Sequence, residues 1–336
     1  MSTPFTLIQG GLTQGALTQG ALTQGAPAAG AVSLRAELRH PASLREPEVE
    51  AWRSLMARAL DPSVYADPDF ALTMAQHLAD GQTLAVLLVW QDGARAPILR
   101  GALPLRLPAH QAMAGRARLW RLPLAGSAEA AIDAGYANFV LRAALDHLRG
   151  SPLHLVDLLW PDLRPDSTLA VALGEAAGGT GRRLTLAEQA APRAAVPAPL
   201  TLPAGRTSLE RVRDPARLRD AVEHFLVLDA RRGADSLLAD PATATAFRVV
   251  TRRFAHRRQA CVDLVRRDGE VVAAAIHLAT GRHDTIWRQA GLCLAQAPVS
   301  AAEPARIEAV VTVERAGTVR APRQRTDLRR LLRLRA

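Results

Sequence analysis

One order of elements occurs twice in this chain: two helices followed by a hairpin with an Asp-Gly turn. In the first half, a helical pattern begins near Pro47 and a second helix follows Asp67-Pro68. Asp92-Gly93 then separates two strand patterns, 83–90 and 98–107. This order restricts the possible folds strongly, because it determines which segments can pair as strands of a sheet and which helices must pack on the face of that sheet.

The second half repeats the order. Asp214-Pro215 and Asp240-Pro241 each place a capping side chain before a proline, which is typical of a helix N-terminus. Asp268-Gly269 follows as the hairpin turn. We therefore expect two structurally related halves. The same order can also recur by chance, because helix-helix-hairpin is a common sequence of elements.

The segment 261–289 is predicted to be a three-stranded meander. Its middle strand, 271–278, is nearly all apolar, so we expect it to be covered on both faces. The alanines at 273–275 leave room near the backbone for a packed helix or for a ligand. The third strand, 283–289, follows a glycine turn.

Composition divides the chain further. Residues 1–33 carry no charged side chain and include a five-residue repeat at 9–26, which predicts a disordered low-complexity leader. Four prolines in 190–206 indicate a linker. The expected halves are 34–189, with a strand at 153–160 and a helix at 167–177, and 207–313. The remainder, 314–336, is an arginine-rich tail.

Charge and cysteine usage exclude several classes of function. All 42 basic residues are arginine and the net charge is +10, but eight Arg against one Asp from Arg315 onward account for +7 of it. We therefore expect no specific nucleic-acid surface on the body, and only weak binding of the tail to anionic surfaces.

Two distant cysteines and nine scattered histidines show no disulfide or zinc spacing, so we expect a reduced, cytoplasmic protein without a metal. Neither a secretory signal nor an apolar run of about 20 residues is found. Phosphate-loop and nucleophile-elbow motifs are also absent from the sequence.

Four segments resemble one family when they are read in order: "AWRSLMARALDPSVYADPDFALTMAQHL" (51–78), "RGALPLRL" (100–107), "RVRDPARLRDAVEHFLVLDARRGADS" (211–236) and "DPATATAFRVVTRRFA" (240–255). The chain resembles the CelD/BcsL-type acetyltransferases of bacterial cellulose biosynthesis, within the GNAT superfamily, over roughly 34–290. The resemblance implies an α/β (α+β) fold, in which tandem GNAT-like halves form mixed, mostly antiparallel sheet flanked by helices. It also implies acetyl-CoA as co-substrate and a sugar or envelope-precursor amine as acceptor.

The resemblance also implies where the site lies. The strand 283–289 is the candidate for pairing with the pantetheine arm, and the loop 296–304, with Val299 and Ser300, is the candidate for the pyrophosphate. Trp287 and Arg288 are candidates for lining the cleft or contacting phosphate. The candidate catalytic groups are His277, His283 and Asp284, with Glu270 nearby; histidine suits proton transfer at neutral pH.

The end of the chain departs from the family. The turn glycine after the third strand and the last sheet portion are missing, which predicts an incomplete second half with an exposed sheet edge. Residues 307–313 form the apolar run available to cover that edge. A frame-shifted or truncated end is one interpretation, and a non-catalytic GNAT-like interaction module is the corresponding alternative function.

Overall fold

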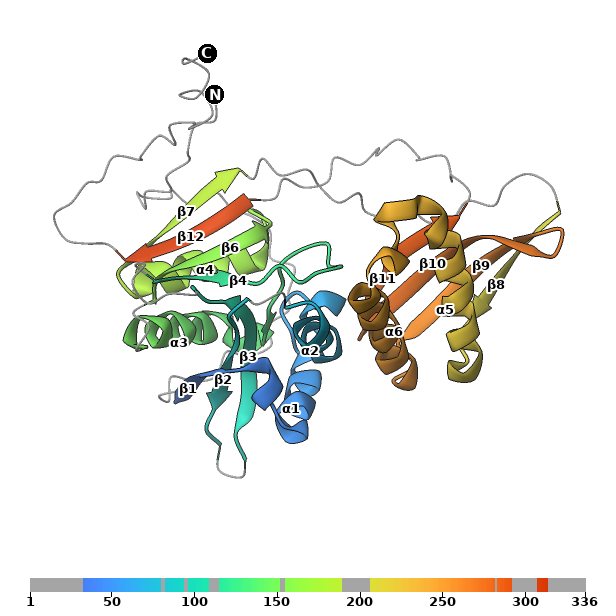
Figure 1. Cartoon of the computed structure of the whole chain (residues 1–336). Helices are drawn as coiled ribbons and strands as arrows, with labels where there is room; N and C mark the ends of the chain where they lie inside the picture. Colours follow the sequence, from blue (N-terminus) through green and yellow to red (C-terminus); the bar gives the residue numbers. More distant parts are fainter. Residues whose placement is uncertain are drawn as a thin grey trace, which may run out of the picture.

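The computed structural model describes residues 33–79, 82–93, 96–108, 115–151, 155–188, 206–281, 283–291 and 307–313. They form two β-sheets that are flanked by helices, and the sheets lie side by side in Figure 1. All strand pairs are antiparallel except β4 with β6. The prediction of mixed, mostly antiparallel sheet flanked by helices is therefore confirmed.

The first sheet has eight strands, in the order β1-β2-β3-β4-β6-β12-β7, with β5 pairing beside β3. Their bounds are β1 Leu34–Arg39, β2 Leu84–Gln91, β3 Ile98–Arg106, β4 Gly115–Leu119, β5 Ala131–Ile132, β6 Leu155–Leu163, β7 Arg182–Glu188 and β12 Ile307–Val313. Helices cover both faces, so β2 is buried almost from end to end, as expected for a covered strand.

Each face of this sheet has its own hydrophobic core. Helices α1 (Glu46–Met56) and α2 (Pro68–His77) pack on one face, where they meet alternate residues of β2. Helices α3 (Ala137–Gly150) and α4 (Thr168–Gly179) pack on the other face. Short 3-10 turns join these elements: η1 Pro41–Ser43, η2 Val64–Ala66 and η3 Ala134–Tyr136.

The second sheet has four strands in the order β11-β10-β9-β8, so that β11 is an edge strand among the described strands. The bounds are β8 Thr207–Val212, β9 Ala260–Arg267, β10 Glu270–Thr280 and β11 His283–Gly291. Helices α5 (Pro215–Asp229) and α6 (Pro241–His256) pack on one face, with η4 Ala230–Asp235 and η5 Leu237–Ala239 between them. The order strand, helix, helix, hairpin thus occurs in both halves.

The local signals of the sequence are present in the structure. Asp67, Asp214 and Asp240 are the N-caps of α2, α5 and α6, and each accepts hydrogen bonds from backbone N–H groups of the first turn. Asp268 and Gly269 have φ values of 53° and 88°, as a tight hairpin turn between β9 and β10 requires. These elements follow from neighbouring residues alone.

Strand β12 does not lie where we expected it. The run was assigned to the second half, as cover for that sheet's edge, but it pairs with β6 on one side and β7 on the other, inside the first sheet. Ala309 and Val311 are buried there, in the core beneath α3 and α4. An interior position is favoured because both edges of the strand then find hydrogen-bond partners.

The halves meet through α2 and α6 and share one core. Trp287 of β11 stacks on Phe247 of α6 with ring centroids 4.7 Å apart and meets Phe70 of α2 edge-on at 5.4 Å. Its indole N–H donates to the backbone oxygen of Leu124 at 2.8 Å. The packing of α2 against α6 is visible in Figure 1. A shared core of this kind makes the halves one cooperative unit.

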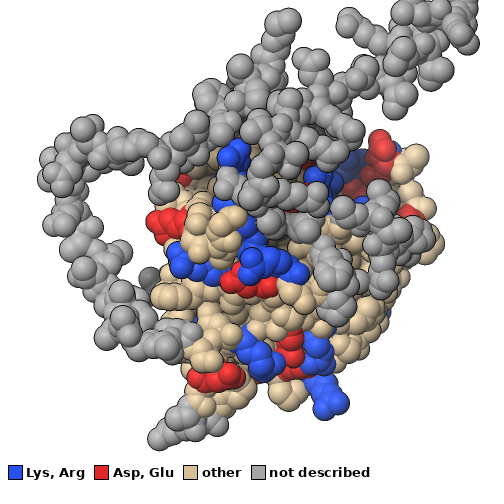
Figure 2. Space-filling view, turned by 90° about the vertical axis from the view of Figure 1, so that its left-hand side faces the viewer, with Lys and Arg blue, Asp and Glu red and all other residues tan. Residues whose placement is uncertain are grey.

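Of the predicted leader (1–33), linker (190–206) and tail (314–336), all but residues 33 and 206 lie outside the described residues. On the face of the first half shown in Figure 2, arginines alternate with acidic side chains, and the described residues of that face form no continuous basic area. Among the helices that the structure describes, none combines the length and apolarity needed to cross a bilayer.

Candidate functional site

A polar pocket of about 470 Å³ lies where the two halves meet. The first half contributes the loop between α1 and α2, the loop after β4 and the end of β6; the second half contributes the start of β11. The polar lining residues are Asp61, Ser63, Tyr65, Ser127, Glu129, Asp162, Arg164, Ser167, His283 and Thr285. Donors, acceptors and an imidazole therefore converge on one cavity, which makes it a candidate binding site.

The first wall of the pocket arises where two parallel strands separate. β4 pairs with β6 from Gly115 to Arg118, after which the chain leaves β6 as the loop 120–130 and returns beside β3 as β5. Two non-glycine residues at this separation, Leu124 and Asp162, have positive φ values of 60° and 61°. Such backbone strain persists only where the surrounding structure imposes it, and it is frequent at functional sites.

The side chain of Asp162 bridges the separated strands. It is 3% exposed and accepts hydrogen bonds from Arg121 and, at 3.2 Å, from the backbone N–H of Ala128. Next to it, buried Ser127 donates its hydroxyl proton to Glu129. Where β4 and β6 separate, the Asp162 carboxylate thus occupies the backbone amide of Ala128.

The second wall is the start of β11, where side chains alternate between the two faces. His283 and Thr285 line the pocket, whereas Asp284 points to the opposite face. Consequently the three predicted catalytic residues do not form one site. Only His283 lies in the pocket.

His277 and Asp284 belong to a charged row across the other face of the second sheet. Arg211 forms two hydrogen bonds of 2.6 Å to Asp263, and its pKa is raised by this bond. Asp263 lies 3.3 Å from Nε2 of His277, and Asp284 lies 3.4 Å from Nδ1. Each member comes from a different strand, so the row ties all four strands together. Cys261 lies close to this row, and burial raises the pKa of its thiol.

The predicted cofactor-binding residues have different positions. Trp287 is 2% exposed and lies in the shared core, so its ring does not line the pocket. Arg288 is partly buried, and desolvation lowers its pKa. Val299 and Ser300, with the predicted pyrophosphate loop, lie outside the described residues. Glu270 is exposed beside the hairpin turn.

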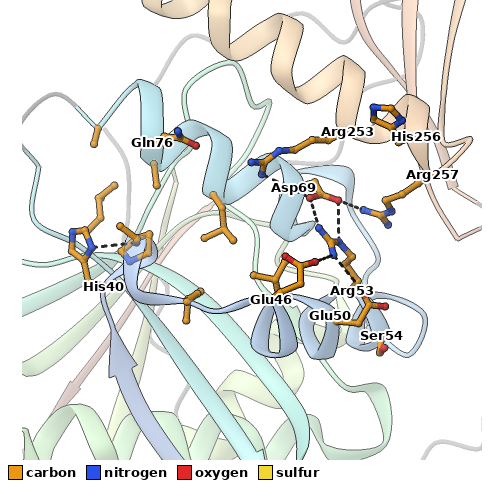
Figure 3. Close-up of a pocket in the computed structure, with 18 of the residues that line it drawn as sticks. His40, Glu46, Glu50, Arg53, Ser54, Asp69, Gln76, Arg253, His256 and Arg257 are labelled. Carbon is orange, nitrogen blue, oxygen red and sulfur yellow. Dashed lines mark hydrogen bonds and ion pairs between the residues drawn. The ribbon is translucent and has the colours of Figure 1, made fainter. Parts of the chain in front are cut away.

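A larger cleft of about 1180 Å³ lies between η1, α1, α2 and α6. Figure 3 shows Asp69 between Arg53 and Arg257, with Arg253 directed toward it. Burial acts to raise the pKa of Asp69, but the hydrogen bonds from Arg53 and Arg257 outweigh it and hold the pKa below its usual value. The carboxylate of Asp69 thus pairs with arginines of both halves, and these ion pairs join the halves across the cleft.

Sequence reasoning missed Tyr65, Glu129 and Asp162. They are far apart in the chain and stand in no recognisable spacing, so only the folding of the first half brings them together, and the meeting of the halves then places them beside His283. A weak signal precedes Tyr65, since Asp61-Pro62 marks an interrupted helix and loops carry functional residues. No group of three or more metal-ligating side chains occurs in the part of the chain that the structure describes.

Residues 201–291 match the family model described as Acetyltransferase (GNAT) domain. The matched range contains β8 to β11 with α5 and α6, the whole second half as the structure describes it. This half therefore has a GNAT acetyltransferase fold. No curated protein matches the chain in sequence.

Three solved structures are similar to the chain at low scores. A tandem GNAT protein from the clavulanic acid biosynthesis pathway is 16% identical, with a TM-score of 0.28, and the alignment covers 83% of this chain and 98% of that one. A conserved protein of unknown function from Bacteroides thetaiotaomicron is 8% identical, with a TM-score of 0.39 and coverages of 79% and 97%. A GCN5-related N-acetyltransferase from Sphaerobacter thermophilus is 12% identical, with a TM-score of 0.23 and coverages of 83% and 94%.

Proposed function

We propose that this protein is an acyl-CoA-dependent N-acyltransferase whose reaction takes place in the pocket between the halves. One observation carries the proposal. The GNAT match ends with β11, and this edge strand directs His283 and Thr285 into a pocket lined by polar residues of the other half, among them Asp162 with its positive φ.

Two places come into question for the pantetheine arm of acetyl-CoA, which needs unpaired strand backbone. The gap between β4 and β6 fits poorly, because Asp162 already occupies the amide of Ala128. The outer edge of β11 from His283 to Arg288 fits better, since it pairs with no other described strand and lies beside the pocket. The bound thioester would supply an electrophilic carbonyl to an acceptor amine.

The residues of the pocket have distinct proposed roles. His283 accepts the proton that the attacking amine loses. The Thr285 hydroxyl donates a hydrogen bond to the thioester carbonyl oxygen, which becomes negatively charged during the attack. Asp162 and Arg121 hold the opposite wall in place. His277 and Asp284 act indirectly, because their contact fixes β11 against β10.

The proposal also includes the class of acceptor and the location of the protein in the cell. The acceptor is an amine, with an amino sugar or envelope precursor as the first class to test, as the CelD/BcsL resemblance implies. Cytoplasmic location is also part of the proposal, because acyl-CoA is a cytoplasmic metabolite.

Calorimetric titration with acetyl-CoA, together with release of free thiol in the presence of an amine panel, tests the function. His283→Gln should lower kcat by about 10²-fold or more while leaving acetyl-CoA binding unchanged. His256→Gln is the matched control, since His256 is an exposed residue of α6 outside this pocket. Equal activity of the two variants would refute the role of His283.

The second candidate is a non-catalytic GNAT-like protein. Two observations favour it: Asp162 closes the gap in the first sheet, and β12 completes the first sheet rather than the second. Absence of acetyl-CoA binding at millimolar concentration would support this function over the first.

A further inference from the structure

Arg288 lies at the meeting of the two halves and has no charged or hydrogen-bonding partner among the residues that the structure describes. Its side chain is partly buried, and its Nε atom is shielded from solvent without a hydrogen-bond partner. Within the described residues, no hydrogen bond or ion pair is formed by its guanidinium. It lies on β11 at a bulge, where the register with β10 shifts.

Such a guanidinium is costly, because arginine stays charged when it leaves water. Other arginines at the same interface avoid this cost. Arg257 contacts Asp67 and Asp69, and Arg53 forms two hydrogen bonds to Asp69. Arg288 is therefore an exception among the interfacial arginines, and its missing partner needs an explanation.

The neighbouring groups do not supply that partner. Tyr65, Asp229 and Arg232 are the titratable groups close enough to influence its charge. The Asp229 carboxylate already accepts a hydrogen bond of 2.6 Å from the backbone N–H of Leu237, and Arg232 lies 3.4 Å from it. Arg232 and Asp229 are paired with each other, so their opposite charges leave the charge of Arg288 uncompensated.

The position of Arg288 connects it to the pocket. Thr285 lines the pocket and precedes Arg288 by three residues on the same strand, so the two α-carbons are at most about 10 Å apart. Tyr65 lines the pocket as well and lies near Arg288. Arg288 itself does not line the pocket, but its distance from Thr285 is within the reach of the other end of a small molecule bound beside His283.

We propose that Arg288 binds an anionic oxygen group, a carboxylate or phosphate, of the amine acceptor. This assignment to the acceptor rests on the proposed function. A planar guanidinium holds such a group through two parallel hydrogen bonds, which would also satisfy the buried Nε. The acceptor is then a small amine that carries its anionic group within about 10 Å of the nucleophilic nitrogen. The phosphates of acyl-CoA are the other source of the same chemistry, and the experiment separates the two.

The anion site is tested first without activity. Thermal midpoints are measured for the wild type, Arg288→Met and Arg257→Met in chloride, acetate and phosphate at constant ionic strength. We expect Arg288→Met to melt at or above the wild type in chloride, and the paired control Arg257→Met to melt well below it. Phosphate or acetate at tenfold its Kd should raise the wild-type midpoint by about 3–5 °C and leave Arg288→Met unchanged. A loss of stability in Arg288→Met comparable to the control, with an unchanged anion response, would overturn the proposal.

Kinetics with paired acceptors identifies the source of the anion. An α-amino acid and its neutral amide are compared, together with acetyl-CoA binding. Arg288→Met should raise KM for the amino acid by about 10–100-fold and leave both KM for the amide and the Kd of acetyl-CoA unchanged. Weaker acetyl-CoA binding without a change in acceptor preference would show that Arg288 binds a phosphate of acyl-CoA. That result would overturn the proposal that it binds the acceptor. If no form of the protein binds acetyl-CoA, the proposed function fails, and the melting experiment still decides the anion site.

Discussion

Arg257→Met removes a charge that joins the halves. The expected loss in the free energy of unfolding follows from the contacts of Arg257. Nη1 of Arg257 lies 2.9 and 3.0 Å from the two oxygens of Asp67 and 2.7 Å from Asp69. Asp67 is fully buried, so the substitution leaves its carboxylate without an ion-pair partner. Loss of one partner of a buried pair costs about 3–5 kcal/mol.

The lower end of this range applies here. The Arg257 side chain is 24% exposed, so water can partly replace it, and Asp69 keeps Arg53. Burial already raises the pKa of Asp67, and without Arg257 the carboxyl takes up a proton more readily, which limits the cost. We expect a loss of about 3 kcal/mol in the free energy of unfolding.

Urea unfolding followed by tryptophan fluorescence measures this loss, and Trp287 reports on the interface directly. The midpoint should fall by about 1 M, given the usual slope for a protein of this size. The double variant Arg257→Met/Asp67→Asn should recover about 2 kcal/mol, because asparagine keeps the N-cap of α2 and removes the buried charge.

Arg248→Met is the matched control. Arg248 forms two hydrogen bonds with Glu223, but the two side chains are 42% and 47% exposed, so the loss should stay below about 1 kcal/mol. Equal effects of the two arginine substitutions, or no recovery in the double variant, would refute the interpretation of the interface as a buried charge pair.

Three further predictions concern stability. Gly101→Ala should destabilise the protein by about 1–3 kcal/mol in the same urea assay, because the added Cβ would lie 2.4 Å from the buried Val140 side chain; an unchanged midpoint would show that α3 shifts freely. Asp69→Asn should lower the free energy of unfolding by its full amount above about pH 4, the usual aspartate pKa, and this loss should disappear as the pH falls through the depressed pKa of Asp69 in the native state. A loss of stability that does not depend on pH would contradict the depressed pKa. Deletion of residues 320–336 should leave the thermal midpoint nearly unchanged and weaken salt-sensitive binding to anionic liposomes or DNA, whereas a deletion that also removes Ile307–Val313 should unfold the first sheet, and a stable, monomeric product would contradict the interior position of β12.

Local signals made much of the secondary structure predictable. The Asp-Pro pairs before α2, α5 and α6 mark helix starts because capping and a fixed proline φ act within one turn. The predicted helix at 167–177 is α4, Thr168–Gly179, with Ser167 as its N-cap. Helical spacing in the sequence continues to Ala59, whereas α1 ends at Met56.

The site was predictable only in part, because strand alternation and distant pairing decide it. His283 and Asp284 are adjacent in sequence and therefore face opposite sides of β11. The sequence suggested the strand but not which of its faces meets the first half, since that depends on packing between segments distant in the chain. Tyr65 and Asp162 were not found because nothing local marks them as neighbours of β11.

The sequence by itself determined where helices, hairpins and the repeated order of elements lie, because these depend on interactions within a few residues. The tertiary structure alone decided that Ile307–Val313 enters the first sheet, that Arg257 pairs with Asp67 across 190 positions, and that the described residues leave the Nε atom of Arg288 without a partner. The reason is physical. Strand pairing and charge pairing over long separations depend on which surfaces exclude water together, and this is set by the packing of α2 against α6 rather than by any one segment.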